Sequence, residues 1–497
     1  MGDAILLAAI NAKWIHPSLA LRLLKANLGE LESQCGIIEF ALRQPLREKI
    51  EPILAARPRI LGLSVSIWNH AATLELLREL QDLWKATQAG RPDWRERPIV
   101  VLGGPEVSHL PEEAEIFRYA DYCIAGEGEI AFRTLCEKIL SDGNDNIASG
   151  IVNSTHFNDE KVFSPQREKY LTGKIAVIPA DPVDVTKIAS GYRLYTGEDL
   201  SRKLVYVEAS RGCPFGCEFC QSAASPVREF PLERFFAEMD DLIDRGAKRF
   251  KFLDRTFNLD IARARRIMEY FLDKIENRPA LVVHFEMVPS RFPPELLETI
   301  ARFPPGTLRL EIGIQTLNAE VSACIGRPSN PEQELAVLRY LRENTGAIIH
   351  ADLIAGLPGE DMASFGRGFD LLWQALAPPA SSAVSRHPRA EIQLGILKLL
   401  PGASIACHTP AFGMRYNPTP PYELMESSAI PARDLDRLKN FARFWELIVN
   451  RALWSPSQTL VFGRFLALSD SLFARFGRNW GIPKNELLEA VHALQAK

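Results

Sequence analysis

The sequence lacks a long apolar run, an excess of charge and a basic N-terminal region. No apolar stretch approaches the ~20 residues of a membrane-spanning helix, so we expect no membrane span. The short apolar run at Ala4–Ile10 has no basic segment before it, which predicts a cytoplasmic protein without a secretory signal. The formal net charge of −4 argues against a general nucleic-acid binder, so no stable nucleic-acid partner is expected.

Cysteine is also scarce, and its placement is uneven. Eight cysteines in 497 residues are too few for a disulfide scaffold. Five are scattered, whereas Cys213, Cys217 and Cys220 lie within eight residues. In a chain expected to be cytoplasmic, such a cluster indicates a metal site first.

The remaining composition is that of an ordinary globular protein. Glycine (31) and proline (34) are too few for a collagen-like or a long disordered chain. Hydrophobic residues make up 46% and charged residues 24%. The length predicts about three domains, and no internal repeat or low-complexity tract is present.

Residues 1–145 alternate between short β-rich apolar runs and helical patterns. This alternation predicts an α/β domain with a doubly wound, flavodoxin-like parallel sheet, whose ligand would bind at the carboxyl ends of the strands. The expected strands are Ala4–Ile10, Gly36–Leu42, Ile60–Val65, Ile99–Leu102 and Tyr122–Ala125, and the expected helices include Leu19–Leu28, Ala71–Trp84 and Glu129–Leu140.

Three further segments follow. Residues 146–203 are polar and turn-rich, and we interpret them as a linker with some short strands. Residues 204–400 resume the alternation with six βα units, which predicts a partial (β/α)6 TIM-like barrel, because a closed barrel has eight. Residues 401–497 contain long amphipathic patterns at Leu435–Leu453 and Glu486–Leu494 and are predicted to form a helical C-terminal domain. The expected barrel strands are Leu204–Glu208, Arg249–Leu253, Val282–Phe285, Arg309–Ile314, Ile348–Ile354 and Gln393–Leu399, with helices at Leu232–Arg245, Ile261–Glu276, Pro294–Phe303, Pro331–Thr345 and Ser364–Leu376.

The cysteine triplet follows the first barrel strand. Thiolates are the usual ligands of iron–sulfur clusters, and three of them can hold three irons of a [4Fe–4S] cube. The fourth iron then stays open to a small molecule with an amine and a carboxylate. Gly212 and Gly216 let the loop turn tightly around the cluster. A zinc site is the alternative, but it normally needs a fourth nearby ligand, and His16, His70 and His109 are distant in sequence. Buried structural thiols would need neither this spacing nor the glycines.

The CxxxCxxC spacing on this loop resembles the radical S-adenosylmethionine (SAM) superfamily. The resemblance implies that SAM chelates the open iron and is cleaved to a 5′-deoxyadenosyl radical when the cluster is reduced by an electron donor such as flavodoxin or ferredoxin. It places Phe219 beside the adenine, although Phe219 would equally pack under the loop. The three cluster ligands are the only catalytic residues it predicts.

Other strand ends resemble the SAM-binding segments of that superfamily. Asp254 stands where the family meets the SAM amino group, although the usual Gly-Gly-Glu is absent. Glu311 and Gln315 are candidates for the ribose hydroxyls, with a core-facing strand as the alternative for Glu311. Gly356 and Gly359 allow the adenine to approach the backbone, with a plain βα turn as the alternative.

The first domain has polar and glycine-rich strand ends where a ligand would bind. No GxGxxG follows the first strand, which argues against a dinucleotide. Together these segments resemble the cobalamin-binding domain that precedes radical SAM barrels. The candidate cobalamin-binding residues are Ser64, Ser66, Gly103, Gly104, Gly126 and Gly128.

One departure from that domain concerns the cobalt. Many cobalamin domains carry Asp-x-His-x-x-Gly after the first strand, and this chain has His16 without the motif. His16 is therefore either a cobalt ligand or a histidine near the surface. Trp14 and Trp68 are candidates to shield the cobalt face, and the alternative is that they belong to the core.

The resemblance implies a cobalamin-dependent radical SAM enzyme that methylates an unactivated carbon. A radical rearrangement or cyclisation with the same cofactors is one alternative. A cobalamin-linked sensor or carrier without radical chemistry is another, and the intact CxxxCxxC argues against it. The substrate is left open between a small molecule, a lipid and a peptide. The segment Tyr416–Glu423 with the helices after it resembles a domain of unknown function appended to some members.

Overall fold

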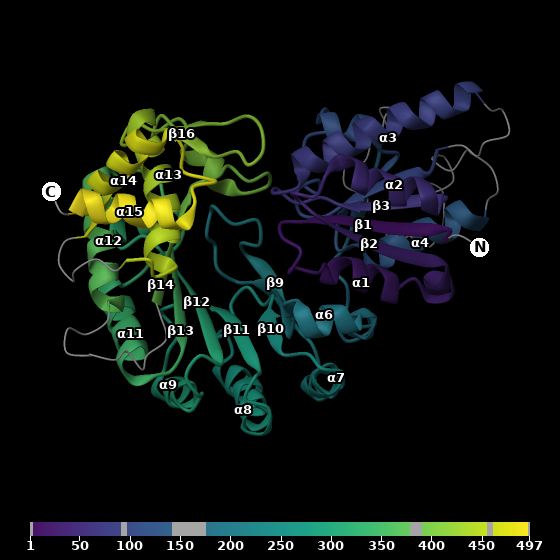
Figure 1. Ribbon diagram of the computed structural model, residues 1–497. Helices are drawn as coiled ribbons and strands as arrows, with labels where there is room; N and C mark the ends of the chain where they lie inside the picture. The colour runs from purple at the N-terminus through teal and green to yellow at the C-terminus, as the bar shows by residue number, and fades with distance from the viewer. Residues whose placement is uncertain (1–2, 91–96, 142–174, 378–389, 455–460, 496–497) are drawn as a thin grey trace. The chain divides into compact units, whose positions relative to one another are not determined.

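The computed structural model describes residues 3–90, 97–141, 175–377, 390–454 and 461–495 (Figure 1). The chain divides into two compact units, Met1–Val207 with Glu229–Ala247, and Glu208–Arg228 with Lys248–Lys497. Of the expected linker, residues 146–174 lie outside the described part of the chain. The domain boundaries expected from the sequence stay predictions.

The first unit is built on a six-stranded sheet with the order β2-β1-β3-β4-β5-β6. All of its pairs are parallel, for example Ile5 with Cys35 and Tyr122 with Ala176. This confirms the predicted doubly wound, flavodoxin-like sheet. The strands are β1 (Ile5–Asn11), β2 (Cys35–Ala41), β3 (Ile60–Ser64), β4 (Ile99–Gly103), β5 (Tyr122–Gly126) and β6 (Ala176–Ala180).

Helices cover both faces of this sheet because alternate strand residues feed two apolar cores. Leu6, Ala8 and Ile10 of β1 pack in one core with α2 and α3, whereas Ile5 and Leu7 pack in the other with α1 and α4. Figure 1 shows these two pairs of helices on opposite sides of the strands. The helices are α1 (Leu19–Ala26), α2 (Leu46–Ala56), α3 (His70–Gly90) and α4 (Gly128–Ser141), with short turns η1 (Gly29–Gln34), η2 (Glu115–Tyr119) and η5 (Tyr192–Leu194) and with α6 (Gly197–Arg202) and α7 (Leu232–Asp244) later in the chain.

A second six-stranded sheet has the order β14-β13-β12-β11-β10-β7. The pairs from β10 to β14 are parallel, and the order is open at both ends, as expected for a partial barrel. The strands are β7 (Val205–Val207), β10 (Arg249–Phe252), β11 (Val282–Met287), β12 (Leu308–Gln315), β13 (Ile348–Ala355) and β14 (Ala390–Ile396), and the helices between them are α8 (Ile261–Asn277), α9 (Pro294–Ala301), α10 (Ala319–Cys324), α11 (Pro331–Asn344) and α12 (Met362–Leu376).

The C-terminal region is mainly helical, as predicted. Its helices pack on α12 through aromatic rings: Phe369 lies edge-on to Phe441 and Trp445, at 5.0 and 4.7 Å between ring centroids. Phe465 of α14 packs against Phe441 in the same aromatic group. The elements are η6 (Ser404–His408), β15 (Arg415–Tyr416), β16 (Leu424–Glu426), α13 (Ala432–Trp445), η7 (Glu446–Asn450), α14 (Phe462–Phe476) and α15 (Lys484–Gln495).

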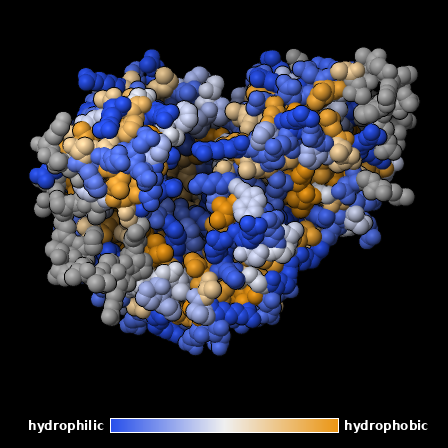
Figure 2. Space-filling model, in the orientation of Figure 1, coloured by the Kyte–Doolittle hydropathy of each residue, from blue (hydrophilic) through white to orange (hydrophobic). Residues whose placement is uncertain are grey.

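Among the described residues, no helix has the length and apolar character needed to cross a bilayer. Hydrophilic residues cover most of the face drawn in Figure 2, with apolar residues in small groups between them.

Candidate functional site

The three clustered cysteines lie on a two-stranded hairpin with a long loop, residues 214–224. Cys213 ends β8 (Ser210–Cys213), and Cys217 and Cys220 lie in the loop to β9 (Ser225–Glu229). Gly212 has φ +96°, and a Cβ at that position would lie 2.0 Å from the carbonyl oxygen of Pro226. Only glycine therefore fits where the two strands of the hairpin meet.

The cysteine sulfurs have the surroundings of cluster ligands. All three are free thiols, and Cys217 is buried. The Arg327 Nη1 donates to the Cys217 sulfur at 3.4 Å, and the backbone N–H of Ser222 donates to the Cys220 sulfur at 3.4 Å. Hydrogen bonds of this kind stabilise thiolates and surround iron–sulfur clusters. The residues present therefore fit a [4Fe–4S] cluster.

Arg327 was not predicted from the sequence, because it lies 110 residues beyond its partner Cys217. The Arg327 Nη2 donates to the carbonyl oxygen of Gly313 at 2.6 Å, which fixes the guanidinium. The preceding Gly326 has φ +67°, and a Cβ there would lie 2.5 Å from the Gly216 carbonyl oxygen. The signal in the sequence was a glycine-arginine pair directly after α10, at a position where the chain approaches the cysteine loop.

Asp254 supports the start of the same hairpin. It is buried, and its two oxygens accept from the Ala209 N–H at 2.9 Å and the Ser210 hydroxyl at 2.6 Å. Burial raises the pKa of its carboxyl to about 7. Both carboxyl oxygens thus accept hydrogen bonds from the protein itself, one from the Ala209 backbone and one from the Ser210 side chain. Contact of Asp254 with SAM stays a prediction. Phe219 is half-buried, so the choice between adenine contact and packing under the loop also stays open.

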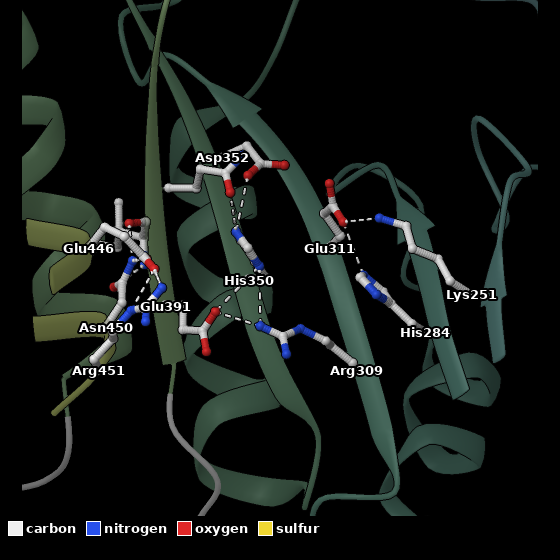
Figure 3. Close-up of polar contacts among 12 residues, drawn as sticks. Lys251, His284, Arg309, Glu311, His350, Asp352, Glu391, Glu446, Asn450 and Arg451 are labelled. Atoms are coloured by element: carbon white, nitrogen blue, oxygen red, sulfur yellow. Dashed lines mark hydrogen bonds and ion pairs between the residues drawn. The ribbon is translucent and has the colours of Figure 1, made fainter. Parts of the chain in front are cut away.

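A row of charged and polar side chains crosses the second sheet (Figure 3). Strands β12 and β13 alternate between buried apolar residues and half-buried polar ones, which places the polar residues on one face. Charged residues on a sheet face inside a barrel are unusual and indicate a functional site. The row consists of Lys251, His284, Glu286, Arg309, Glu311, His350, Asp352, Glu391 and Gln393.

Glu311 is the centre of this row. Its carboxylate lies 2.8 Å from the Lys251 ammonium and 3.0 Å from the His284 Nε2. Although burial opposes the charged form, His284 and Lys251 hold the pKa of Glu311 well below its usual value. Burial lowers the pKa of His284 to about 4. Glu311 is therefore a fixed anion, and its predicted contact with ribose hydroxyls remains a prediction.

Asp352, on the neighbouring strand, is in the opposite state. One of its oxygens is buried without a hydrogen-bond partner among the described residues, and the nearest ion-pair partner, His350, lies at 3.6 Å. Burial and then the charges of Glu311 and Glu286 raise the pKa of Asp352 to about 8. The carboxyl is therefore neutral near pH 7. Alternation of polar residues along strands expected to be buried was the signal that could have revealed His350 and Asp352.

This shift predicts a pH-dependent stability for the protein without SAM. Because the pKa of Asp352 is higher in the folded chain than its ordinary value of 3.8, the wild type loses stability as the pH rises from about 4 to about 8. Asp352→Asn cannot ionise, so it is expected to gain stability relative to the wild type, by up to about 4 kcal/mol between pH 5 and pH 8.

Thermal unfolding at the two pH values measures this effect. Glu343→Gln, which alters an exposed acid on α11, serves as the control and should show no such relative gain. Equal relative stability of Asp352→Asn at pH 5 and pH 8 would contradict the neutral state of this carboxyl.

The remaining candidate SAM residues lie at the ends of β12 and β13. Gln315 has φ +69° beside an irregularity in the pairing of β12 with β13, a strained backbone for a residue other than glycine. Gly356 and Gly359 have φ +88° and +81°. A Cβ on Gly356 would lie 2.5 Å from Leu424, and one on Gly359 would lie 3.1 Å from Phe412. At both glycines, the group that lies close to the backbone is therefore a side chain of the protein itself. Adenine binding there stays a prediction.

In the first unit, the candidate cobalamin residues lie at the carboxyl edge of the sheet. Ser64 ends β3, and Asn69 donates to the carbonyl oxygens of Ser64 at 3.1 Å and Ile10 at 2.9 Å. The Ser66 N–H donates back to Asn69 at 2.8 Å. Asn69, which was not predicted to act in this way, therefore ties the ends of β1 and β3 together.

The glycine pairs after β4 and β5 are joined at the same edge. The Ser108 hydroxyl donates to the Gly104 carbonyl oxygen at 2.8 Å and accepts from the Gly126 N–H at 3.2 Å. Gly104 and Gly126 have φ +111° and +117°, and a Cβ would lie 2.4 Å from the Val65 oxygen and 2.2 Å from the Ala180 oxygen.

The other glycines of the two pairs, Gly103 and Gly128, differ in the space around them. A Cβ on Gly103 would meet no atom closer than 3.8 Å, and one on Gly128 would lie 3.1 Å from Leu24. A backbone edge without side chains at Gly103 fits a large ligand lying against it. Cobalamin contact by each of these residues stays a prediction.

The loop after β1 differs from one expectation. The side chains of Trp14 and Trp68 are 46% and 53% exposed, so the alternative that they belong to the core is wrong. The Arg202 guanidinium lies 5.4 Å from the Trp14 ring, close enough for a cation–π contact. The Nδ1 of His16 shares a hydrogen bond of 2.8 Å with the Tyr206 hydroxyl.

Comparison with known proteins agrees with this geometry. Residues 5–136 match the family model of the B12 binding domain, and residues 207–372 match that of the radical SAM superfamily. The chain therefore contains a B12-binding domain and, after it, a radical SAM domain. The two matches confirm the expected cofactor set of a [4Fe–4S] cluster, SAM and cobalamin.

One curated relative is the cobalamin-dependent radical SAM methyltransferase TokK of Streptomyces tokunonensis. It is 25% identical over 363 residues, which cover 67% of this chain and 47% of TokK. The chain spans about half the length of the curated relatives it matches.

Two solved structures share the fold. The cobalamin-dependent SAM radical enzyme OxsB with aqua-cobalamin bound has a TM-score of 0.63 at 14% identity, covering 99% of this chain and 75% of OxsB. The radical SAM methyltransferase TsrM of Kitasatospora setae has a TM-score of 0.56 at 19% identity, covering 87% of this chain and 83% of TsrM.

Proposed function

We propose that this protein is a cobalamin-dependent radical SAM enzyme that transfers a methyl group to an unactivated carbon. The observation that carries the proposal is the presence, in one chain, of a B12-binding domain and of a hairpin with three free cysteines, of which Cys217 and Cys220 accept N–H hydrogen bonds. The name of the relative TokK supports methyl transfer as the reaction.

When bound, the cluster together with SAM would supply radical chemistry for hydrogen abstraction, and cobalamin would supply the methyl group. The chain's own residues hold the cofactors and orient the reacting groups. Cys213, Cys217 and Cys220 bind the cluster, and Arg327 donates an N–H hydrogen bond to the Cys217 sulfur, which holds this ligand in place. Glu311 and the neutral Asp352 present an anion and a proton donor on the same sheet face.

The reaction needs partners that follow from its chemistry. An electron donor such as flavodoxin or ferredoxin would reduce the cluster, and the substrate is a small molecule or a peptide. The candidate SAM residues remain Phe219, Asp254, Glu311, Gln315, Gly356 and Gly359, and the candidate cobalamin residues remain those at the carboxyl edge of the first sheet.

SAM with an isotope-labelled methyl group tests the reaction. The anaerobically reconstituted protein, with a reductant and a candidate substrate extract, is expected to form 5′-deoxyadenosine together with a product that carries the label. Mass spectrometry detects both. Deoxyadenosine without label in any product would instead support the rearrangement or cyclisation reaction, and the absence of both would favour a sensor or carrier.

A further inference from the structure

A group of metal-ligand side chains lies beside the cysteine hairpin but uses none of its three cysteines. Glu218 belongs to the hairpin loop, whereas Cys407 and His408 belong to η6. One ligand atom of each residue lies within 4.8 Å of the other two. The Cys407 sulfur is 4.0 Å from the Glu218 Oε2, and the same oxygen is hydrogen-bonded to the His408 Nε2. Two segments about 190 residues apart thus bring a thiol, an imidazole and a carboxylate together.

The backbone holds these ligands in place without a metal. The Glu218 N–H donates to the Ile325 carbonyl oxygen at 3.1 Å, and the Glu218 carbonyl oxygen accepts from the Ile405 N–H at 2.9 Å. The Gln221 side-chain amide donates to the Pro401 carbonyl oxygen at 2.8 Å. Because the hairpin and η6 are already joined, binding an ion would order few additional groups, which lowers its entropic cost.

The histidine ring has its two nitrogens in different surroundings. Nε2 faces Glu218, and Nδ1 lies 3.8 Å from the Cys324 sulfur. A metal-bound histidine typically uses its second nitrogen for an outer partner that fixes the ring, and Cys324 is in the place of that partner.

We propose that Glu218, Cys407 and His408 bind a zinc ion that ties the cysteine hairpin to η6. Sulfur, nitrogen and oxygen ligands together suit zinc, and the thiolate and carboxylate balance its two positive charges. Around a tetrahedral zinc, such ligand atoms lie about 3.3–3.5 Å apart. The sulfur and the Glu218 oxygen therefore need to close by about half an ångström, whereas the hydrogen-bonded His408 Nε2 and Glu218 Oε2 need to move apart to admit the ion. Zinc binding releases the Cys407 thiol proton to water, and the ion takes the place of the hydrogen bond between the His408 Nε2 and the Glu218 carboxylate.

The geometry also sets how the site is reached and completed. Cys407 is exposed, so an ion can reach the site from solvent. Three protein ligands leave the fourth position to water. The site is separate from the proposed reaction, because the cluster needs only Cys213, Cys217 and Cys220.

Metal analysis of the full-length protein tests the site. The protein is reconstituted anaerobically with iron and sulfide, equilibrated with zinc chloride, desalted and analysed for both metals. The wild type is expected to hold about one zinc per chain. Cys407→Ser and His408→Ala are expected to lose at least about tenfold of the bound zinc and to keep the iron of the wild type. His492→Ala, which removes an exposed histidine on α15, should keep both metals.

Two further results separate this proposal from the proposed function. Cys213→Ala should lose cluster iron and retain zinc, so a failure of the cluster assignment leaves the zinc result readable. Zinc X-ray absorption should show one sulfur ligand in the wild type. The proposal is overturned if the wild type holds no zinc, if Cys407→Ser and His408→Ala hold as much as the wild type, or if these variants lose iron in place of zinc.

Discussion

Cys217→Ala is expected to lose most of the cluster iron and to form 5′-deoxyadenosine at least about 100-fold more slowly than the wild type. Cys217 is the buried member of the triplet, and its sulfur receives the Arg327 hydrogen bond. Two thiolates cannot hold three irons of the cube, and the proposed cleavage of SAM depends on the reduced cluster. Iron analysis and chromatography of the reaction mixture measure the two effects.

Cys136→Ala is the matched control for this variant. Its thiol is equally free and buried, but it lies on α4 in the first unit, where alanine is a good helix former. Burial raises the pKa of this thiol far above its usual value, so it is not a ready metal ligand. A full complement of cluster iron in Cys217→Ala, or an equal loss in Cys136→Ala, would show that the triplet is not the cluster site.

Gly104→Ala should remove cobalamin binding while leaving the cluster in place. The positive φ of Gly104 and the 2.4 Å approach to the Val65 oxygen mean that alanine forces the loop after β4 to move. We expect a loss of at least about 2 kcal/mol in the stability of the first unit. The segments after β4 and β5, which Ser108 joins through Gly104 and Gly126, would lose their arrangement. Cobalamin affinity is therefore expected to fall at least about tenfold. Bound cobalt measures the affinity, and bound iron should equal that of the wild type.

Gly197→Ala is the control in the same unit. No atom lies within 4 Å of a Cβ built on Gly197, which begins α6. This variant should bind cobalamin as the wild type does. If Gly104→Ala also did so, the carboxyl edge of the first sheet would not be the cobalamin site.

The local patterns of the sequence predicted most of the fold. Each expected strand of the first sheet lies within two residues of its position in the structure, because alternate residues of a strand such as β1 are buried on both faces. β6 was missed as a member of this sheet, since Ala176–Ala180 stands in a stretch that reads as a linker. α14 was missed although its aromatic residues form part of the C-terminal core.

The site was predicted only as far as its residues are close in sequence. The spacing of Cys213, Cys217 and Cys220 indicated a cluster directly, whereas Arg327 reaches Cys217 through tertiary folding. The approach of His408 to Glu218 likewise joins distant segments, and no spacing rule would have suggested it. Asp254 shows the converse case, because a residue read as a ligand contact has both oxygens bonded within the protein.

The assay with methyl-labelled SAM tests the central claim most directly when it is run on three proteins side by side. The wild type is expected to form both deoxyadenosine and a labelled product. Cys217→Ala should form neither, and Gly104→Ala should form deoxyadenosine without a labelled product. Label transfer by Gly104→Ala at the wild-type rate, or a wild-type protein that holds cluster and cobalamin yet forms no deoxyadenosine, would contradict a cobalamin-dependent radical SAM methyltransferase.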